Sequence, residues 1–489
     1  MKKATILHIS DLHRSRAREI TNQALLTSLL NDKDHYMMET PAISAPNIIV
    51  VSGDVVRGAS DDPKGEEIKR QYDQALEFMN NLTSQFLDGD KSRIVIIPGN
   101  HDIDWRFSKG SMVKVDPELY KDDKSTRKQY LRNAISEHTK IRWSWDDLAF
   151  YEIKDEQVYK QRLEAFSNFY SAFYEGKRTY SLKPEEQFEI FDMPEYGVSF
   201  LALNSCFNND HLKTMGDINP VCLADPYKPL KELKKKGRLL LATWHHNTKG
   251  LPYAFDYMDS SKMKNLIDLG ISIGFHGHQH KTEIITEFNN IIDQKRIVVF
   301  SAGTLCSGAE ELPTGHNRQY NIVELTPVSD NTVGKVRVTL HTREKTSTSS
   351  FENPIWTAGR IDSTMNSSFS TDIDVPIVSD PTEYMLEAEK FIKGGKLPEA
   401  VAILVRLPLA DPFVRKYLSE ALLTLNDHKN IVKYFNEPQN ASEAAYLIAS
   451  ALELNDKTIM KAVSENSFIR DSTDLAVREM KKKMEFKLR

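Results

Sequence analysis

Five short polar clusters in this chain carry the side chains that could do chemistry. Each one directly follows an apolar run typical of a buried strand. They are Asp11-x-His13, Gly53-Asp54, Gly99-Asn100-His101-Asp102, His245-His246 and Gly277-His278-x-His280. Carboxylates, imidazoles and an amide without a thiolate suit Mn²⁺, Fe, Zn²⁺ or Ni²⁺ and disfavour a calcium cage or a structural zinc. So many donors exceed the needs of one catalytic ion and fit two divalent ions about 3.5–4 Å apart that share a carboxylate.

The spacing inside these clusters has a physical use. In extended backbone, residues two apart point to the same side. Asp11 and His13 are therefore expected to converge on one point, and His278 and His280 on another. In the GNHD cluster, His101 carries a proton near neutral pH, and Asp102 could hold that imidazole in one tautomer.

The elements that must position these clusters alternate between strand and helix. Apolar runs predict buried strands at Thr5–Ser10, Asn47–Ser52 and Arg93–Ile97, and helical spacing predicts helices at Arg18–Leu30 and Gly65–Phe86. This alternation predicts parallel strands joined by right-handed crossovers. Their carboxyl ends share one edge of the sheet, which is where sites form in open α/β folds.

More strands are expected downstream, with few helices between the later ones. They are Phe188–Phe191, Gly197–Leu203, Leu239–Thr243, Ile271–Phe275, Glu283–Glu287, Arg296–Phe300, Tyr320–Leu325 and Lys335–His341. A parallel half followed by an antiparallel half predicts two packed sheets flanked by helices.

In their order along the chain, DLH, GD, GNHD, a histidine after a strand and GHxH resemble the motifs of the calcineurin-like metallophosphoesterase family. The resemblance implies an α/β fold, namely a four-layer αββα sandwich, with a dinuclear metal centre in which we favour Mn²⁺. Motif by motif, it implies that one metal is held by Asp11, His13, Asp54 and His280. It implies that the other is held by Asp54, Asn100, His245 and His278. It also implies that His101 is an outer-sphere acid or transition-state stabiliser, oriented by Asp102.

The family resemblance implies phosphoester hydrolysis by a metal-bridging hydroxide without a covalent enzyme intermediate. We expect a phosphodiesterase acting on a nucleotide or nucleic acid. The alternatives are a phosphomonoesterase, acting on a nucleotide or a protein, and a module whose main role is to recruit a partner. Arg14, Arg57 and His246 are candidates for substrate contacts. Their structural alternatives are an ion-paired or solvated arginine and a packed histidine.

Three regions differ in composition. Residues 1–344 are expected to form the catalytic domain, with a helical insertion or lid at 104–187. Residues 345–380, rich in Ser, Thr, Asn and Asp, predict a linker or an extended strap. Residues 381–489 predict an all-α domain, in which similar segments recur at roughly 30 residues, as in paired-helix repeats. A plain helical bundle is the alternative, and the domain could bind a protein partner or self-associate.

The overall composition is that of an ordinary globular protein. A formal net charge of −5 over 489 residues argues against a general nucleic-acid coat but leaves room for a local basic groove. Three cysteines without CxxC spacing predict buried side chains in a reducing compartment. The short N-terminal apolar run does not resemble a signal sequence, and no stretch reaches membrane-spanning length. We therefore expect a cytoplasmic protein with no membrane partner.

Overall fold

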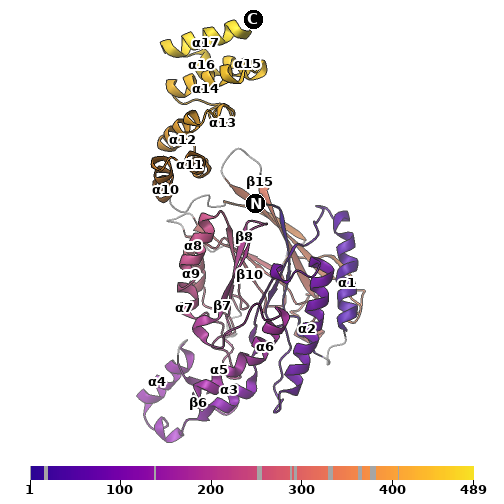
Figure 1. Cartoon of the computed structure of the whole chain (residues 1–489). Helices are drawn as coiled ribbons and strands as arrows, with labels where there is room; N and C mark the ends of the chain where they lie inside the picture. The colour runs from indigo at the N-terminus through magenta and orange to yellow at the C-terminus, as the bar shows by residue number, and fades with distance from the viewer. Residues whose placement is uncertain are drawn as a thin grey trace. The chain divides into compact units, whose positions relative to one another are not determined.

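The computed structural model describes residues 2–15, 20–136, 139–250, 256–286, 289–290, 295–328, 334–361, 366–374, 381–405 and 407–488. The chain divides into two compact units, Met1–Val375 and Pro376–Arg489. The first unit contains every predicted site residue and both large sheets (Figure 1).

The first sheet is built around the strand that precedes Asp11. Its strands are β1 (Ala4–Ile9), β2 (Ile48–Ser52), β3 (Ile94–Ile97), β15 (Gln319–Val328), β16 (Lys335–Lys345), β17 (Trp356–Ala358) and β18 (Ser368–Asp374). The order is β17-β16-β15-β1-β2-β3, and β18 also pairs with β16. β1, β2 and β3 are parallel, as expected, and β15 pairs antiparallel with β1.

The second sheet has a parallel centre and antiparallel edges. Its strands are β7 (Phe188–Met193), β8 (Val198–Leu203), β9 (Leu239–Thr243), β10 (Ile273–His276), β11 (Glu283–Ile285) and β14 (Val298–Ser301). The order is β11-β14-β10-β9-β8-β7, with β8, β9, β10 and β14 parallel. A separate short ladder pairs β12 (Asn289–Asn290) with β13 (Lys295–Arg296).

The two sheets pack face to face and share one large hydrophobic core, with helices outside them. The outer helices are α1 (Asn22–His35), α2 (Glu66–Leu87) and α6 (Glu164–Phe173) beside the first sheet, and α7 (Pro220–Ala224), α8 (Tyr227–Lys235) and α9 (Ser261–Asp268) beside the second. Figure 1 shows α2 and α1 on one side of the sheets and α7, α8 and α9 on the other. The first unit is thus a four-layer αββα sandwich.

The segment 104–187 corrects the expectation of a helical insertion. Besides α3 (Trp105–Ser111), α4 (Lys124–Ile135) and α5 (Glu156–Lys160), it contains an antiparallel sheet in the order β4-β6-β5. These strands are β4 (Met112–Lys114), β5 (Ile141–Ser144) and β6 (Ala149–Ile153). They are too short for their alternation to stand out from the sequence. The last helix, α6, packs against α2 as part of the main core.

Of the two expectations for the segment 345–380, the structure differs from a linker and is nearer to an extended strap along the first unit. Within the described residues it contributes β17 and β18, both paired antiparallel with β16. Backbone hydrogen bonds form these strands, and β18 leaves most of its side chains partly exposed, which explains the polar composition. The first sheet therefore extends past residue 344, whereas residues 375–380 lie outside the described part of the chain.

The second unit is helical throughout its described residues. Its helices are α10 (Pro381–Lys393), α11 (Leu397–Leu404), α12 (Pro412–Thr424), α13 (His428–Tyr434), α14 (Ala441–Leu454), α15 (Lys457–Glu465), α16 (Ser467–Arg470) and α17 (Leu475–Leu488). The recurring Asn-Asp pairs have a clear cause. Asn426 and Asn455 turn the chain in left-handed backbone, and Asp427 and Asp456 then cap the next helix.

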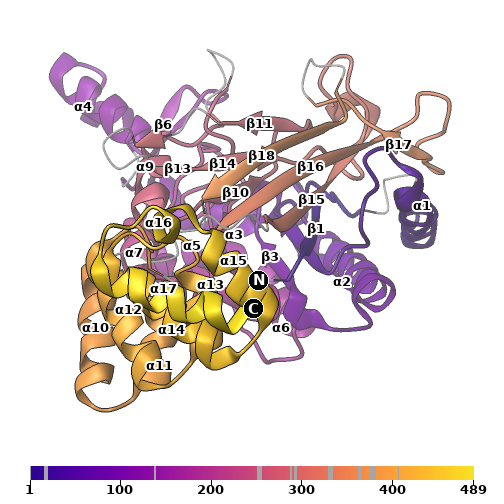
Figure 2. The ribbon, with the colours of Figure 1, turned by 90° about the horizontal axis from the view of Figure 1, so that it is seen from above.

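Figure 2 gives a second view of the same elements. Helices α10 to α14 contact one another in chain order, and the unit has two hydrophobic clusters of its own. Whether this packing is a true repeat stays a prediction. None of the helices in the described ranges is long and apolar enough to span a bilayer.

Candidate metal centre

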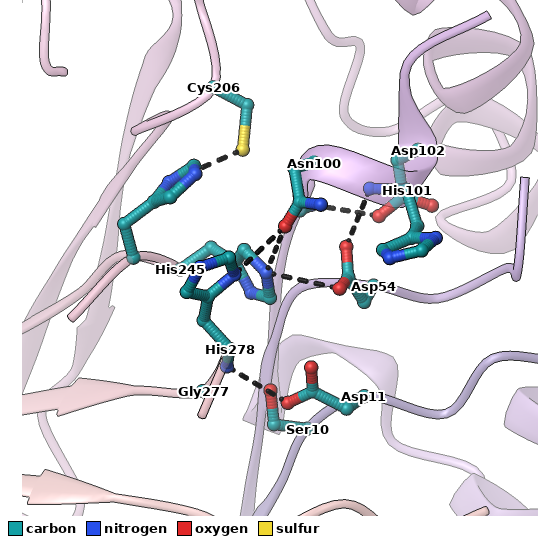
Figure 3. A network of polar contacts seen from close by, with 12 residues as sticks. Ser10, Asp11, Asp54, Asn100, His101, Asp102, Cys206, His245, Gly277 and His278 are labelled. Atoms are coloured by element: carbon teal, nitrogen blue, oxygen red, sulfur yellow. Dashed lines mark hydrogen bonds and ion pairs between the residues drawn. The ribbon is translucent and has the colours of Figure 1, made fainter. Parts of the chain in front are cut away.

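The five polar clusters meet just beyond the carboxyl ends of β1, β2, β3, β9 and β10. Figure 3 shows the resulting network from close by, with loops from the two sheets facing each other across it. The backbone of one loop supports the next. Asp11 donates its N–H to the Gly53 carbonyl at 3.1 Å, and Gly277 donates to the His245 carbonyl at 3.1 Å. The cluster is therefore one connected structure rather than five independent turns.

The first group of donor atoms gathers around Asp11. The distance from Asp11 Oδ1 to His280 Nε2 is 3.2 Å, and to His13 Nε2 it is 3.8 Å. The two imidazole Nε2 atoms are 3.3 Å apart. Asp54 Oδ2 lies 3.8 Å from His13 Nε2 and so borders this group.

The second group shares that same Asp54 oxygen. His245 Nε2 lies 3.1 Å from Asp54 Oδ2 and 3.0 Å from Asn100 Oδ1. His278 Nδ1 is also 3.0 Å from Asn100 Oδ1 (Figure 3). The structure thus brings together all seven side chains predicted as ligands, in two groups that meet at Asp54. Their roles as ligands stay predictions.

The physical reason for this convergence differs from the one the sequence offered. Strand alternation was expected to aim Asp11 with His13 and His278 with His280. Instead β1 ends at Ile9 and β10 ends at His276, before these residues. Asp11, His13, His278 and His280 all have positive φ, as does Asp54. Non-glycine residues rarely adopt this left-handed conformation, and such strain is concentrated at functional sites.

Glycines let the loops approach each other closely. A Cβ added at Gly99 would lie 2.1 Å from Asp54 Oδ1, and one added at Gly277 would lie 1.8 Å from Ser10 Oγ and 2.5 Å from Asp11 Oδ2. The glycines of GNHD and GHxH are therefore required by close contact around the two carboxylates.

The buried carboxylates of the cluster stabilise positive charge on the groups around them. Burial lowers the pKa of His245, but the charge and hydrogen bond of Asp54, together with the charge of Asp11 and the Ser52 carbonyl, raise that pKa to about 9. Burial likewise opposes protonation of His280, yet the charge of Asp11 raises its pKa to about 9. Against their own burial, the neighbouring histidines hold the pKa of both Asp11 and Asp54 below the usual range.

These residues fit divalent cations. Asp11 and Asp54 are buried, and in the described part of the chain no lysine or arginine pairs with either. Asp11 Oδ1 accepts no hydrogen bond there, although it is fully buried. The neighbours of these two carboxylates are histidines, so their buried negative charge must be balanced by protonated imidazoles or by bound cations. Three groups of ligand atoms lie within 4.8 Å of one another: Asp11, His13 and His280; His13, Asp54 and His101; and Asp11, Asp54 and His245.

Contacts behind the histidines fix which ring nitrogen faces the cluster. His245 Nδ1 donates to the Ser52 carbonyl at 2.8 Å, which leaves Nε2 as the donor atom for a metal. His280 Nδ1 lies 2.8 Å from the Glu311 carbonyl, and His278 Nε2 lies 3.4 Å from Asp256 Oδ2. Such partners orient metal-binding imidazoles and raise their basicity.

Asp102 holds the loops together. Its buried carboxylate accepts the backbone N–H groups of Gly99 at 2.8 Å, Val55 at 3.1 Å and Val56 at 3.3 Å. It also accepts the hydroxyl of Tyr72 at 2.9 Å. Burial, reinforced by the charge of Asp54, raises the pKa of Asp102 to about 7. One side chain therefore joins the GD loop to the GNHD loop.

This arrangement corrects the expected role of Asp102 toward His101. The imidazole Nδ1 of His101 lies 2.7 Å from the backbone carbonyl of Arg57, to which it donates. His101 also donates its own backbone N–H to Asp54 Oδ1 at 2.8 Å. The tautomer is thus set by a main-chain carbonyl, because the Asp102 carboxylate faces the loop amides.

The three residues considered for substrate contact differ in their exposure to solvent. Arg14 is 2% exposed, donates to the Ile20 carbonyl at 3.2 Å and lies over the Phe78 ring. His246 is fully buried, and burial holds its pKa well below the usual value. Both side chains are thus packed inside the protein, and a contact of either with a substrate stays a prediction. The Arg57 side chain is 43% exposed beside the cluster, with its Nε 3.8 Å from Glu311.

The sequence did not identify Ser205 and Tyr72, two residues that hold the loops of the site in place. Ser205 Oγ accepts the backbone N–H of His245 at 3.0 Å and of His246 at 3.1 Å. Its position two residues after the strand Gly197–Leu203 was a usable signal, because the other polar clusters were recognised by their position after strands. Tyr72 lies inside α2 on the apolar stripe, and nothing local distinguishes its hydroxyl from that of a core tyrosine.

Comparison with known proteins places the chain in a family. A family model described as calcineurin-like phosphoesterase matches residues 4–282. A search of curated proteins found no match. Similar solved structures include a purple acid phosphatase from yellow lupin (Lupinus luteus) seeds, with 10% identity and a TM-score of 0.38 over 76% of this chain and 53% of that one. The alignment therefore spans about half the length of the lupin enzyme.

Two further structures are a dimetal phosphatase from Danio rerio and a metallophosphoesterase from Sphaerobacter thermophilus. The first has 10% identity and a TM-score of 0.37 over 70% of this chain and 96% of that one. The second has 12% identity and a TM-score of 0.24 over 65% and 82%. The family match covers more than half of the sequence and spans every predicted ligand from Asp11 to His280. The chain therefore belongs to the calcineurin-like phosphoesterase family, the hydrolases of phosphoesters.

Proposed function

We propose that this protein is a dinuclear metal-dependent phosphodiesterase that acts on a nucleotide or nucleic acid. The observation that carries the proposal is the pair of donor groups sharing Asp54 Oδ2, one through His13 at 3.8 Å and one through His245 at 3.1 Å. A shared carboxylate between two sets of nitrogen and oxygen donors is the arrangement that two-metal hydrolases use. The ligands would be Asp11, His13, Asp54, Asn100, His245, His278 and His280.

Two bound divalent ions would supply Lewis acidity toward the phosphoryl oxygens and a source of activated water. Mn²⁺ is favoured, and Fe, Zn²⁺ or Ni²⁺ also suit the mixed imidazole, carboxylate and amide donors. The imidazoles of His245 and His280 must be neutral to act as ligands. Their raised pKa values mean that binding an ion displaces protons.

The residues around the ligands would handle the substrate. His101 donates through Nδ1 to Arg57, so its Nε2 is free to donate to a phosphoryl or leaving-group oxygen when the ring is protonated. The half-exposed guanidinium of Arg57 is suited to bind a phosphate oxygen, since guanidinium and phosphate pair through charged hydrogen bonds. Asp102 contributes by holding the loop from which the Arg57 carbonyl points.

The experiment combines metal analysis with a choice of substrates. Protein stripped with EDTA is reloaded with Mn²⁺, and its metal content is measured by elemental analysis. We expect two ions per chain and faster hydrolysis of bis-p-nitrophenyl phosphate than of p-nitrophenyl phosphate. A preference for the monoester would mean that the protein is a phosphomonoesterase, the alternative function. Fewer than two ions in active protein would refute the dinuclear centre.

We further propose that the second unit is a helical-repeat module that binds a protein partner or a second copy of this chain. Its support is the contact of α10 to α14 in chain order and the repeated Asn-Asp caps. We also propose a cytoplasmic location. All three cysteines are buried and free, which suits a reducing compartment.

A further inference from the structure

The inserted region, residues 104–187, is held in a fixed position against a loop that supports the candidate metal centre. Arg142 of β5 is buried and donates from Nε to Asp210 Oδ2 at 2.6 Å and from Nη2 to Asn208 Oδ1 at 2.8 Å. Tyr159 of α5 also donates to Asp210 Oδ2, at 2.7 Å. Asp210 belongs to the loop that begins after β8 and carries Ser205. A buried, fully bonded ion pair of this kind holds two segments in one geometry.

The outermost helix of this region, α4, has very little packing. No residue of α4 is buried, and Figures 1 and 2 show the helix projecting from the first unit. It carries four cations and no acidic residue: Lys124, Arg127, Lys128 and Arg132. Within the described ranges none of the four forms an ion pair. Positive charge that forms no ion pair among the described residues, on a projecting helix, is a candidate surface for a polyanion.

Three of the cations lie on one side of α4. Tyr130 and Ala134 pack toward the small core of the inserted region. At 100° per residue, Lys124, Lys128 and Arg132 fall on the side away from these two. Each cation is one turn, or about 6 Å along the axis, from the next. Leu131 and Ile135 occupy the same side and are 40% and 73% exposed.

An exposed aromatic ring directly follows β5, the strand that α4 contacts. Trp145, at the tip of the β5–β6 hairpin, is 76% exposed. Its ring is 5.8 Å from that of Trp143, which packs on the same small core as Tyr130 and Ala134. Leu148 ends the turn with a positive φ. The other aromatic rings of this core are packed, so Trp145 is set apart from them by its exposure.

We propose that α4 and Trp145 form a binding surface for single-stranded nucleic acid. Backbone phosphates would lie along Lys124, Lys128 and Arg132, with a base stacked on Trp145. Combining a row of cations with an exposed aromatic ring is how proteins bind single strands without reading sequence. The proposal rests on the phosphodiesterase function above, because the helix and the metal cluster then select the same polymer of phosphodiesters.

The alternative ligand for this surface is an acidic protein segment. The exposed Leu131 and Ile135 could contact either a nucleic acid or a protein. Nucleic acid is favoured because its phosphates match both the row of cations on α4 and the phosphoester chemistry of the family. A flat, exposed indole also fits a base, which offers a face of similar size.

Binding is measured by fluorescence anisotropy with a fluorescein-labelled single-stranded oligonucleotide in EDTA, so that no hydrolysis occurs. The variant Lys124→Ala/Lys128→Ala is compared with Lys457→Ala/Lys461→Ala, which removes two exposed lysines one turn apart on α15. We expect the α4 variant to bind at least about tenfold more weakly at low salt. Its slope of log affinity against log salt should fall by about 1.4. The α15 control should behave like the unaltered protein, and Trp145→Ala should weaken binding where Trp145→Phe does not.

Other outcomes would overturn the proposed surface or show whether the surface or the proposed phosphodiesterase function is wrong. Equal loss in the α4 and α15 variants, or no binding by the unaltered protein, overturns it. So does polyglutamate or duplex DNA binding to α4 in preference to the single strand. The α4 variant should hydrolyse bis-p-nitrophenyl phosphate normally. Normal hydrolysis without oligonucleotide binding would refute only this surface. Binding that depends on α4, without diester hydrolysis under any metal, would support the surface and refute the proposed function.

Discussion

Asp54 is the residue on which both donor groups depend, since its Oδ2 borders each of them and its Oδ1 accepts the His101 backbone N–H. Asp54→Ala should therefore lose bound metal and turnover together. His101→Ala removes a ring that we place outside the ligand set, so it should keep its metal and lose about 10²–10⁴ in rate.

Elemental analysis and diester hydrolysis on the same samples check this contrast. His101 also belongs to one of the groups of atoms close enough to hold an ion. If His101→Ala lost an ion, the ring would be a ligand rather than an acid. If Asp54→Ala kept two ions and its rate, the shared-carboxylate arrangement would be wrong.

Among the elements, α2 has a role beyond packing because Tyr72 reaches from it to Asp102. Tyr72→Phe removes one of the four hydrogen bonds that Asp102 accepts and should lower the free energy of unfolding by about 1–2 kcal/mol. The GD and GNHD loops would be held less firmly. We therefore expect kcat for the diester to fall while KM and metal content stay unchanged.

Tyr174→Phe is the matched control for this prediction. Tyr174 is equally buried, and its hydroxyl donates to the Ile94 carbonyl at 2.9 Å, at the opposite end of β3 from the metal cluster. Its loss should affect stability similarly and leave kcat alone. Denaturant titration and steady-state kinetics measure both effects. Equal changes in kcat for the two variants would mean that Tyr72 acts only through general stability.

For the whole molecule, the position at which the first unit ends can be tested. Each unit has its own hydrophobic clusters, so a fragment of residues 1–375 should fold and hydrolyse a small diester like the full chain. A fragment of residues 1–345 lacks β17 and β18 and exposes the edge of β16 that is not paired with β15. It also loses Trp356, whose indole N–H donates to Ser28 Oγ at 2.9 Å.

The shorter fragment should aggregate or melt at a lower temperature, because a long exposed strand edge recruits other chains. Size-exclusion chromatography, thermal melting and the diester assay compare the two fragments. Equal stability of both would show that the strands after residue 345 are dispensable. Inactivity of the longer fragment would mean that the helices of the second unit support the catalytic unit.

The sequence alone predicted the main strands of the two large sheets in their order along the chain, together with the polar clusters that follow five of them. Buried parallel strands require continuous apolar runs, and the polar residues that interrupt them mark the carboxyl edge. Both signals are local, so the clusters could be located from the sequence, whereas the family resemblance implied the ligand roles of Asp11, Asp54, Asn100, His245 and His278.

Only the tertiary structure decided what each side chain meets. Asp102 bonds loop amides rather than His101, Arg14 and His246 are buried, and β17 and β18 complete a sheet that begins far earlier in the chain. These outcomes depend on contacts between segments distant in sequence. Composition and periodicity describe a segment's own surface, and they do not specify which distant backbone or side chain will be packed against it.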